Sequence, residues 1–268
     1  MKEFQRFNLH SHTARCGHAI GTDEEYVLAA IEAGFETMGF SDHVFLPGAN
    51  QPGMRGSYEQ LDDYLNSVGD LQRKYQDKIR IFKGFEAEWL GEKFAPYYRE
   101  LLETGKIDYL LQGQHCFYDE HFYWYGDYFD RTKGSLAYVQ DLVEGMESGL
   151  FLYVAHPDLF MLWHGGFDTA AYEIARIICE KSLELDIPLE INMAPSRRYK
   201  AGKTQLSGLP YPNKRFWEIA AKMGVSCVFG VDAHRPSDYA VSDYAFFKKF
   251  AAELGLKLVN PLDKLTRK

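Results

Sequence analysis

The sequence has 268 residues, of which 46% are hydrophobic and 15% aromatic, so it can bury a large core and is unlike a disordered chain. Its net charge of −8, from 30 Lys+Arg against 38 Asp+Glu, disfavours binding to long nucleic acids. The length suits one large α/β unit, and we expect a single domain over residues 1–268.

Short runs rich in β-branched and aromatic residues alternate with longer amphipathic stretches along the chain. The predicted strands cover 4–10, 37–43, 79–89, 108–115, 151–156, 187–192 and 225–234. The predicted helices follow them at 23–34, 57–75, 94–104, 134–148, 168–184, 213–223 and 238–254. Seven strand–helix units of this kind predict a parallel sheet, either open and doubly wound or closed into a TIM-like barrel.

Side chains that can bind metal recur at the ends of the predicted strands. On a strand, residues i and i+2 point to the same side, so His10 and His12 can present two imidazoles to one ion. Asp232 and His234 have the same spacing. Barrel enzymes build their active sites at the C-terminal ends of the strands, so this convergence favours the barrel. The candidate ligands are His10, His12, His18, Asp42, His43, Glu86, His115, His156, Asp232 and His234.

Imidazole and carboxylate ligands without thiolate suit Zn²⁺, with Mn²⁺ or Fe²⁺ as alternatives. These candidates are too many for one tetrahedral ion, so we expect two or three ions, with Glu86 able to bridge a pair. No Cys-x-x-Cys pair, signal core or membrane-length apolar segment is present in the sequence. We therefore expect a reduced, cytoplasmic protein that does not associate with membranes.

The signatures of covalent hydrolases are missing from the sequence. No cysteine has an arginine six positions later, and there is no Gly-x-Ser-x-Gly elbow or phosphate-binding Gly-Lys loop. A metal-activated hydroxide is therefore the expected nucleophile of any hydrolysis. The aromatic segment 117–130 is either a lid over the site or a packed surface loop. His121 and His164 fall outside the predicted strand ends, and we expect them to be loop or substrate-pocket histidines.

The order and spacing of the candidate ligands, from His10-x-His12 to Asp232-x-His234, resemble those of the polymerase-and-histidinol-phosphatase (PHP) family of metallohydrolases. The resemblance covers nearly the whole chain and implies a distorted (β/α)₇ barrel with its active site at the C-terminal ends of the strands. Within the family the chain is most similar to the histidinol-phosphate phosphatases. The matching segments are NLHSHTARCGHA at the start and EINMAPSRR at 190–198.

The resemblance implies a centre of three divalent ions. Three ligand sets would hold them: His10, His12, Glu86 and Asp232; Glu86, His115 and His156; and His18, His43 and His234.

The reaction implied is hydrolysis of L-histidinol phosphate to L-histidinol and phosphate, a step of histidine biosynthesis. Arg197 would stabilise charge on the transferring group, and Arg15 is a further candidate phosphate contact. Asp42 is either the acid that protonates the leaving alkoxide or a carboxylate that orients a histidine ligand. Two alternatives stay open: a PHP phosphoesterase acting on a nucleotide or an oligonucleotide 3′ end, and a non-catalytic metal-binding or assembly module.

Overall fold

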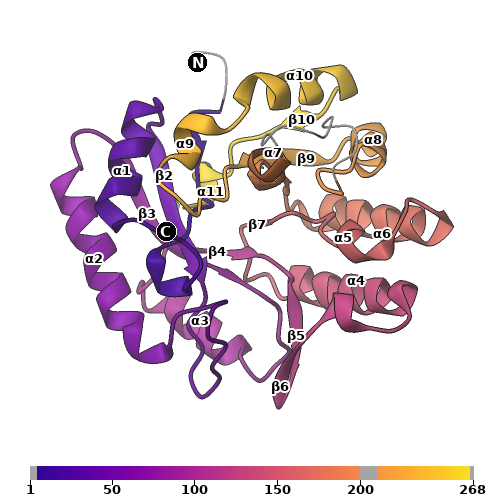
Figure 1. Cartoon of the computed structure of the whole chain (residues 1–268), viewed down its shortest axis with the longest axis horizontal. Coiled ribbons are helices and arrows are strands. Elements are labelled where there is room, and N and C mark those ends of the chain that lie inside the picture. Colours follow the sequence, from indigo (N-terminus) through magenta and orange to yellow (C-terminus); the bar gives the residue numbers. More distant parts are fainter. Residues whose placement is uncertain (1–4, 200–209, 266–268) are drawn as a thin grey trace.

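The computed structural model describes residues 5–199 and 210–265, and at its centre lies one eight-stranded parallel sheet (Figure 1). The strands are neighbours in the sheet in the order in which they occur in the chain. They are β1 (Phe7–Asn8), β2 (Thr37–His43), β3 (Arg80–Ala87), β4 (Tyr109–Gln112), β7 (Tyr153–Val154), β8 (Leu189–Asn192), β9 (Ser226–Gly230) and β10 (Lys257–Leu258).

The segment that follows β1 meets the segment that follows β9, which brings two distant parts of the sheet together. Ser11 forms a parallel bridge with Ala233. The side-chain amide of Gln5, just before β1, donates to Phe229 O and accepts from Phe229 N on β9. These two bonds link β1 to β9, which do not pair through their backbones. The prediction of an α/β, TIM-like barrel is confirmed in a distorted form, because the strand ladder is not continuous around it.

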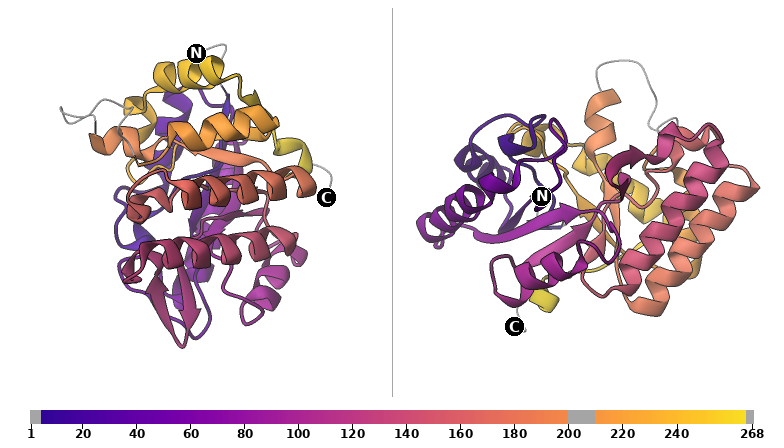
Figure 2. Two further views of the ribbon diagram at one scale, coloured as in Figure 1. Left: turned by 90° about the vertical axis from the view of Figure 1, so that its right-hand side faces the viewer. Right: turned by 90° about the horizontal axis from the view of Figure 1, so that it is seen from below.

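Helices cover the sheet on two sides, with α1, α2 and α3 on one and α4, α6 and α8 on the other (Figure 1). Helices α4 and α6 run side by side, which is clearest in the turned views of Figure 2. The α-helices are α1 (Asp23–Glu32), α2 (Leu61–Lys74), α3 (Ala95–Glu103), α4 (Arg131–Glu147), α5 (Met161–His164), α6 (Thr169–Leu185), α7 (Ala194–Tyr199), α8 (Lys214–Met223), α9 (Asp238–Val241), α10 (Tyr244–Leu254) and α11 (Leu262–Leu265). Among the described residues, no helix is both long and apolar enough to cross a bilayer.

The helix boundaries follow local capping chemistry. Thr22 and Glu25 form a reciprocal capping box at the start of α1, and the Asn213 side chain accepts from the first turn of α8. The predicted helix 238–254 is broken, since Ser242 is extended and the Asp243 side chain caps a new helix, α10. The capping signals therefore fix the helix starts better than periodicity alone.

The core has an inner and an outer layer because successive strand residues face opposite sides. On β4, Tyr109 and Leu111 belong to an inner cluster with residues of β1, β3, β7 and β9, whereas Leu110 packs with α1, α2 and α3. A third cluster joins β8 and β9 to α4, α6, α8 and α10. The inner cluster fills the barrel interior, so the polar residues at the strand ends rest on a packed apolar base.

All seven predicted strands are present, but most are shorter than predicted. Residue 4 of the predicted strand 4–10 lies outside the described residues. Predicted strand 225–234 ends at Gly230, so Asp232 and His234 lie in the loop beyond it. The structure adds strand β10, the short helices α5, α7 and α11, and a hairpin of β5 (Cys116–Asp119) and β6 (His121–Trp124) inside the aromatic segment.

Candidate metal centre

The nine residues predicted as metal ligands lie at the C-terminal ends of the strands. His43 is the last residue of β2 and is paired in register with Glu86 on β3. The others lie on the segments that follow β1, β4, β7 and β9. Parallel strands end at one edge, so residues far apart in the chain converge there. These residues are His10, His12, His18, His43, Glu86, His115, His156, Asp232 and His234.

Four donor atoms lie close together at this edge. Nε2 of His10 and Nε2 of His12 are 3.4 Å apart, and each is 3.4 Å from Glu86 Oε2. Asp232 Oδ1 lies 3.6 Å from the first nitrogen and 3.1 Å from the second. Tetrahedral zinc with bonds of about 2.0–2.1 Å requires donors about 3.3–3.4 Å apart. The donors of His10, His12 and Glu86 therefore have the spacing of part of a tetrahedral shell, and Asp232 Oδ1 lies beside both imidazoles.

A buried oxygen without a hydrogen bond supports the same interpretation. Asp232 Oδ1 is buried and forms no hydrogen bond within the described residues, although three imidazole nitrogens, from His10, His12 and His234, lie near it. Buried polar atoms normally have a partner, because an unpaired one loses its hydration without compensation. Donors that converge on a common point rather than on each other fit a divalent ion at that point.

The other oxygen of Glu86 faces a second group of histidines. Glu86 Oε1 lies 2.7 Å from His156 Nε2 and 3.5 Å from His115 Nε2. One possible ligand atom from each of these three residues lies within 4.8 Å of the other two. Glu86 therefore contributes one oxygen to each of two neighbouring groups, which is the arrangement expected of a bridging carboxylate.

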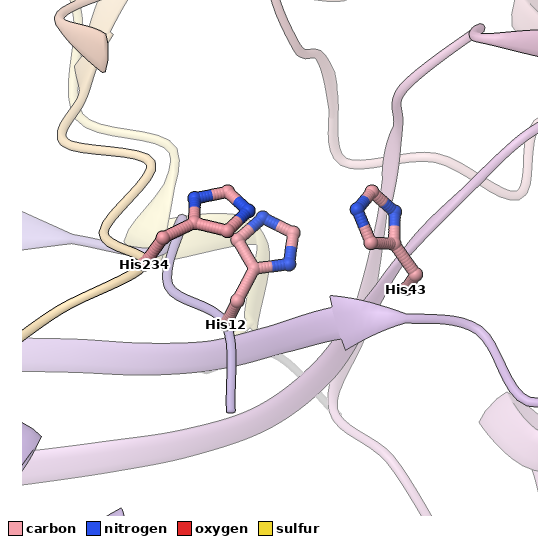
Figure 3. Close-up of side chains that lie close together, drawn as sticks. All are labelled: His12, His43 and His234. Carbon is pink, nitrogen blue, oxygen red and sulfur yellow. The ribbon is translucent and has the colours of Figure 1, made fainter. Parts of the chain in front are cut away.

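A third group of imidazoles surrounds the open side of the cluster. His12, His43 and His234 each offer a nitrogen within 4.8 Å of the others, with His43 lying across from the other two (Figure 3). The rings of His12 and His234 are stacked with centroids 4.0 Å apart. His18, the exposed member, has Nε2 3.0 Å from His234 Nε2. The histidines of the predicted third set thus adjoin one another, with His12 beside them.

Two buried glutamates orient the histidines from behind. Glu190 Oε2 lies 2.8 Å from His10 Nδ1, and Glu88 Oε1 lies 3.0 Å from His115 Nδ1. A carboxylate on the second ring nitrogen fixes the tautomer and the direction of the first. The sequence analysis missed both glutamates. The available signal was strand spacing, since Glu88 follows Glu86 by two residues and Glu190 precedes Asn192 by two.

Charge within the cluster shifts its pKa values. Burial lowers the pKa of His10, but the carboxylates of Glu190, Asp232 and Glu86 outweigh it and raise that pKa well above its ordinary value. Burial raises the pKa of Glu86, but the surrounding imidazoles outweigh it and hold that pKa well below the usual range. Burial is likewise outweighed by nearby carboxylates at His12 and His156, whose pKa values are raised as well. Burial lowers the pKa values of His18, His43 and His234. A metal ion must displace any proton held on a ligand imidazole in order to bind.

The backbone is strained at two of the predicted ligands. His156 has φ 31° and Asp232 has φ 51°, in a region that residues with a side chain rarely adopt. Each such residue costs about 1–3 kcal/mol and persists only where its surroundings hold it. Strain at two residues of one cluster marks the strand ends as a functional site.

Asp42 is completely buried and is absent from the lining of the cavity described below. Its Oδ1 accepts from His43 N and lies 3.6 Å from His12 Nδ1, and its Oδ2 accepts from the Thr13 hydroxyl. This geometry suits a carboxylate that orients a histidine. Either predicted role of Asp42 stays a prediction.

The two arginines predicted to contact phosphate are engaged elsewhere. Arg15 forms ion pairs with Asp23 and Asp63. Arg197 donates to the backbone oxygens of Val231 and Asp232. Neither arginine lines the cavity described below, but Arg197 lines a second cavity, of about 550 Å³, together with His18 and His234. The phosphate contacts of both arginines stay predictions.

A cavity of about 350 Å³ adjoins the histidine–carboxylate cluster. Part of its lining is formed by His12, Glu86, His156 and other members of the cluster. The rest of the lining is an apolar wall that includes Met54, Trp124, Leu159, Leu162, Trp163 and Tyr211. Small-molecule sites typically combine such an apolar wall with a few convergent polar groups.

The β5–β6 hairpin supplies part of this wall through Trp124 and the following Gly126. Its role as a lid stays a prediction. His121 is exposed on β6, and His164 is held by Ser135 Oγ and Asp168 Oδ1. Neither of these histidines lines the cavity.

Comparison with known proteins identifies one family. The PHP domain matches residues 8–194. The chain is 30% identical over 241 residues to a probable histidinol-phosphatase of Deinococcus radiodurans, covering 85% of this chain and 86% of the relative. It is 22% identical over 275 residues to the histidinol-phosphatase of Bacillus subtilis, covering 91% of this chain and 99% of that relative.

Two solved structures share the fold. A putative histidinol phosphatase of Listeria monocytogenes superposes with a TM-score of 0.72 at 20% identity, covering 90% of this chain and 99% of that one. The histidinol phosphate phosphatase of Lactococcus lactis, complexed with zinc, L-histidinol and phosphate, superposes with a TM-score of 0.70 at 17% identity. The superposition covers 96% of both chains.

Proposed function

This chain belongs to the PHP domain family, and from that premise we propose that it hydrolyses L-histidinol phosphate to L-histidinol and phosphate. The predicted resemblance to the family is confirmed by the match over residues 8–194. The substrate is supported by histidinol-phosphatases that align with most of the chain. The enzyme is then a metal-dependent phosphomonoesterase of histidine biosynthesis, and we propose that it works in the cytoplasm.

The observation that carries this proposal is the position of Glu86, whose two oxygens face separate histidine groups beside a small-molecule cavity. We propose three divalent ions, with Zn²⁺ the best fit and Mn²⁺ or Fe²⁺ as alternatives. Their ligands would be the three predicted sets: His10, His12, Glu86 and Asp232; Glu86, His115 and His156; and His18, His43 and His234.

Ions held there would lower the pKa of water, so that hydroxide would be available as the nucleophile near neutral pH, and would neutralise the charge on the phosphoryl oxygens. The protein's own part is to orient the ligands. Glu190 and Glu88 would fix two ligand imidazoles, and the position of Asp42 supports the same role toward His12 rather than that of an acid. The apolar wall of the cavity would receive the carbon skeleton and ring of the substrate.

A panel of phosphate esters tests the substrate directly. The zinc-loaded protein is assayed with L-histidinol phosphate, nucleoside monophosphates and 3′-phosphorylated oligonucleotides. We expect kcat/KM for L-histidinol phosphate to exceed the others by about 100-fold or more. A nucleotide or oligonucleotide as the best substrate would favour the second enzyme hypothesis. Full metal loading with no hydrolysis of any ester would favour the non-catalytic module.

A further inference from the structure

The segment that carries Asp232 and His234 is held from two sides by a pair of side chains. Arg197, on α7, donates from Nη1 to Val231 O at 2.7 Å and from Nη2 to Asp232 O at 2.7 Å. Asp238, at the start of α9, accepts at Oδ2 from His234 N at 2.9 Å and from Arg235 N at 3.0 Å. One side chain thus binds the carbonyls of the segment and the other binds its N–H groups.

The two side chains are also paired with each other. Arg197 Nε lies 3.2 Å from Asp238 Oδ1, and the side chains are only 10% and 11% exposed. Ser242 connects them further, since its hydroxyl accepts from Arg197 Nη1 and donates to Asp238 O. Because the pair is shielded from water, the attraction between its two charges is weakly screened. The planar guanidinium of Arg197 also fixes the direction of its hydrogen bonds.

The held segment needs support because its backbone is strained. Asp232 has φ 51°, and its side chain points at His10 and His12 while the His234 ring stacks on His12. Such a conformation lasts only where neighbouring groups determine it. The carbonyl of the strained residue itself is a partner of Arg197.

We propose that Arg197 and Asp238 are positioning residues that fix the Asp232–His234 segment in its metal-binding conformation. Arg197 reaches this segment through its backbone, since its N–H groups contact Val231, Asp232 and Ser242 and its Nε faces Asp238. The proposal rests on the proposed function only in that Asp232 and His234 bind metal.

Zinc affinity of the variants tests the proposal without any substrate. Arg197→Ala removes the carbonyl contacts. Asp238→Asn keeps an amide oxygen that can accept from the segment but removes the charge that faces Arg197. Arg176→Ala is the matched control, because this surface arginine pairs with Glu173 and Glu180 on its own helix, away from the segment. Affinity is measured by competition with a chelator, and circular dichroism checks the fold.

We expect Arg197→Ala and Asp238→Asn each to weaken zinc binding by about 10- to 100-fold, and Arg176→Ala to leave it unchanged. The double variant should lose little more than either single one, because the pair acts as a unit. Arg197→Lys, which keeps the charge but not the fork, should fall between the alanine variant and the unchanged protein.

A second measurement separates this role from a phosphate contact. With excess zinc, Asp238→Asn should recover turnover at an unchanged KM. Unchanged zinc affinity of Arg197→Ala and Asp238→Asn, together with a raised KM and weaker inhibition by inorganic phosphate in Arg197→Ala, would overturn the proposal in favour of a phosphate contact. If Arg197→Ala does not fold, Asp238→Asn decides by the same readout. If the unaltered protein binds zinc but does not hydrolyse L-histidinol phosphate, the proposed function fails while the affinity test still stands.

Discussion

Gly113 leaves the space that the carboxylate of Glu86 occupies: a Cβ added to this glycine would lie 1.9 Å from Glu86 Oε1 and 2.5 Å from Cδ. Its backbone φ is not in the left-handed region, so space alone requires a glycine here. The residue after β4 therefore helps to set where the proposed bridging carboxylate can lie.

Gly113→Ala should displace the Glu86 carboxylate and so weaken both groups of ligands that it serves. We expect about a 10- to 100-fold loss of zinc affinity, with hydrolysis falling in parallel. Gly166→Ala is the control, because a Cβ there meets nothing within 4 Å. Metal analysis of both proteins after gel filtration gives the answer, and equal zinc contents would contradict this role of Gly113.

Glu190→Gln and Glu88→Gln should weaken zinc binding because each replaces a carboxylate that holds a ligand imidazole. The partners are His10 at 2.8 Å and His115 at 3.0 Å. The expected loss is about 10- to 100-fold in affinity by chelator competition. Glu218→Gln, at an exposed pair on α8, should behave as the unaltered protein does. Affinities unchanged in both buried variants would mean that the imidazoles are oriented without these carboxylates.

Zinc binding should depend steeply on pH. Burial lowers the pKa of His12, but Asp232, Asp42 and Glu86 outweigh it and raise that pKa to about 9 in the metal-free protein. The folded pKa exceeds the unfolded one, so this histidine stabilises the metal-free fold fully below about pH 6.5 and progressively less as pH rises through about 9. Zinc must displace the proton, so below about pH 9 its affinity should rise about tenfold per pH unit for each proton released.

Melting temperatures of metal-free and zinc-loaded protein across this pH range measure both effects. The metal-free Tm should fall as pH rises, and the gain on adding zinc should grow. A gain that is constant with pH would show that no proton is displaced.

Trp124→Ala should weaken substrate binding at the apolar wall. The side chain lines the cavity and is 41% exposed, so its loss removes only part of a full apolar burial. We expect about a fivefold lower kcat/KM for L-histidinol phosphate, equivalent to about 1 kcal/mol. Inhibition by inorganic phosphate should not change. Phe129→Ala, on the same segment but fully exposed, is the control, and a similar loss in both variants would refute a specific role for Trp124.

The position of the candidate metal centre could be predicted because histidines and carboxylates recur in the sequence wherever a predicted strand ends. His43 and Glu86 stand at matching positions of neighbouring strands, and the i, i+2 spacing of His10 and His12 shows that they share a face. Residue type and strand position together were sufficient for these ligands.

The supporting contacts could not be predicted in the same way. Glu88 and Glu190 look like ordinary strand residues until the fold brings them against His115 and His10. An arginine has the same donors whether it faces phosphate or a backbone carbonyl, so the sequence could not reveal that Arg197 binds Asp232 O. Such contacts depend on loop conformation, which periodicity does not encode.

Steady-state hydrolysis of L-histidinol phosphate, with metal content measured on the same sample, tests the central claim most directly. Chelated protein should be inactive, and titration with zinc should restore hydrolysis in step with the metal bound. Glu86→Gln should bind less zinc and stay inactive over the same titration. Hydrolysis that survives complete removal of metal, or a fully loaded protein that leaves L-histidinol phosphate intact, would contradict the account.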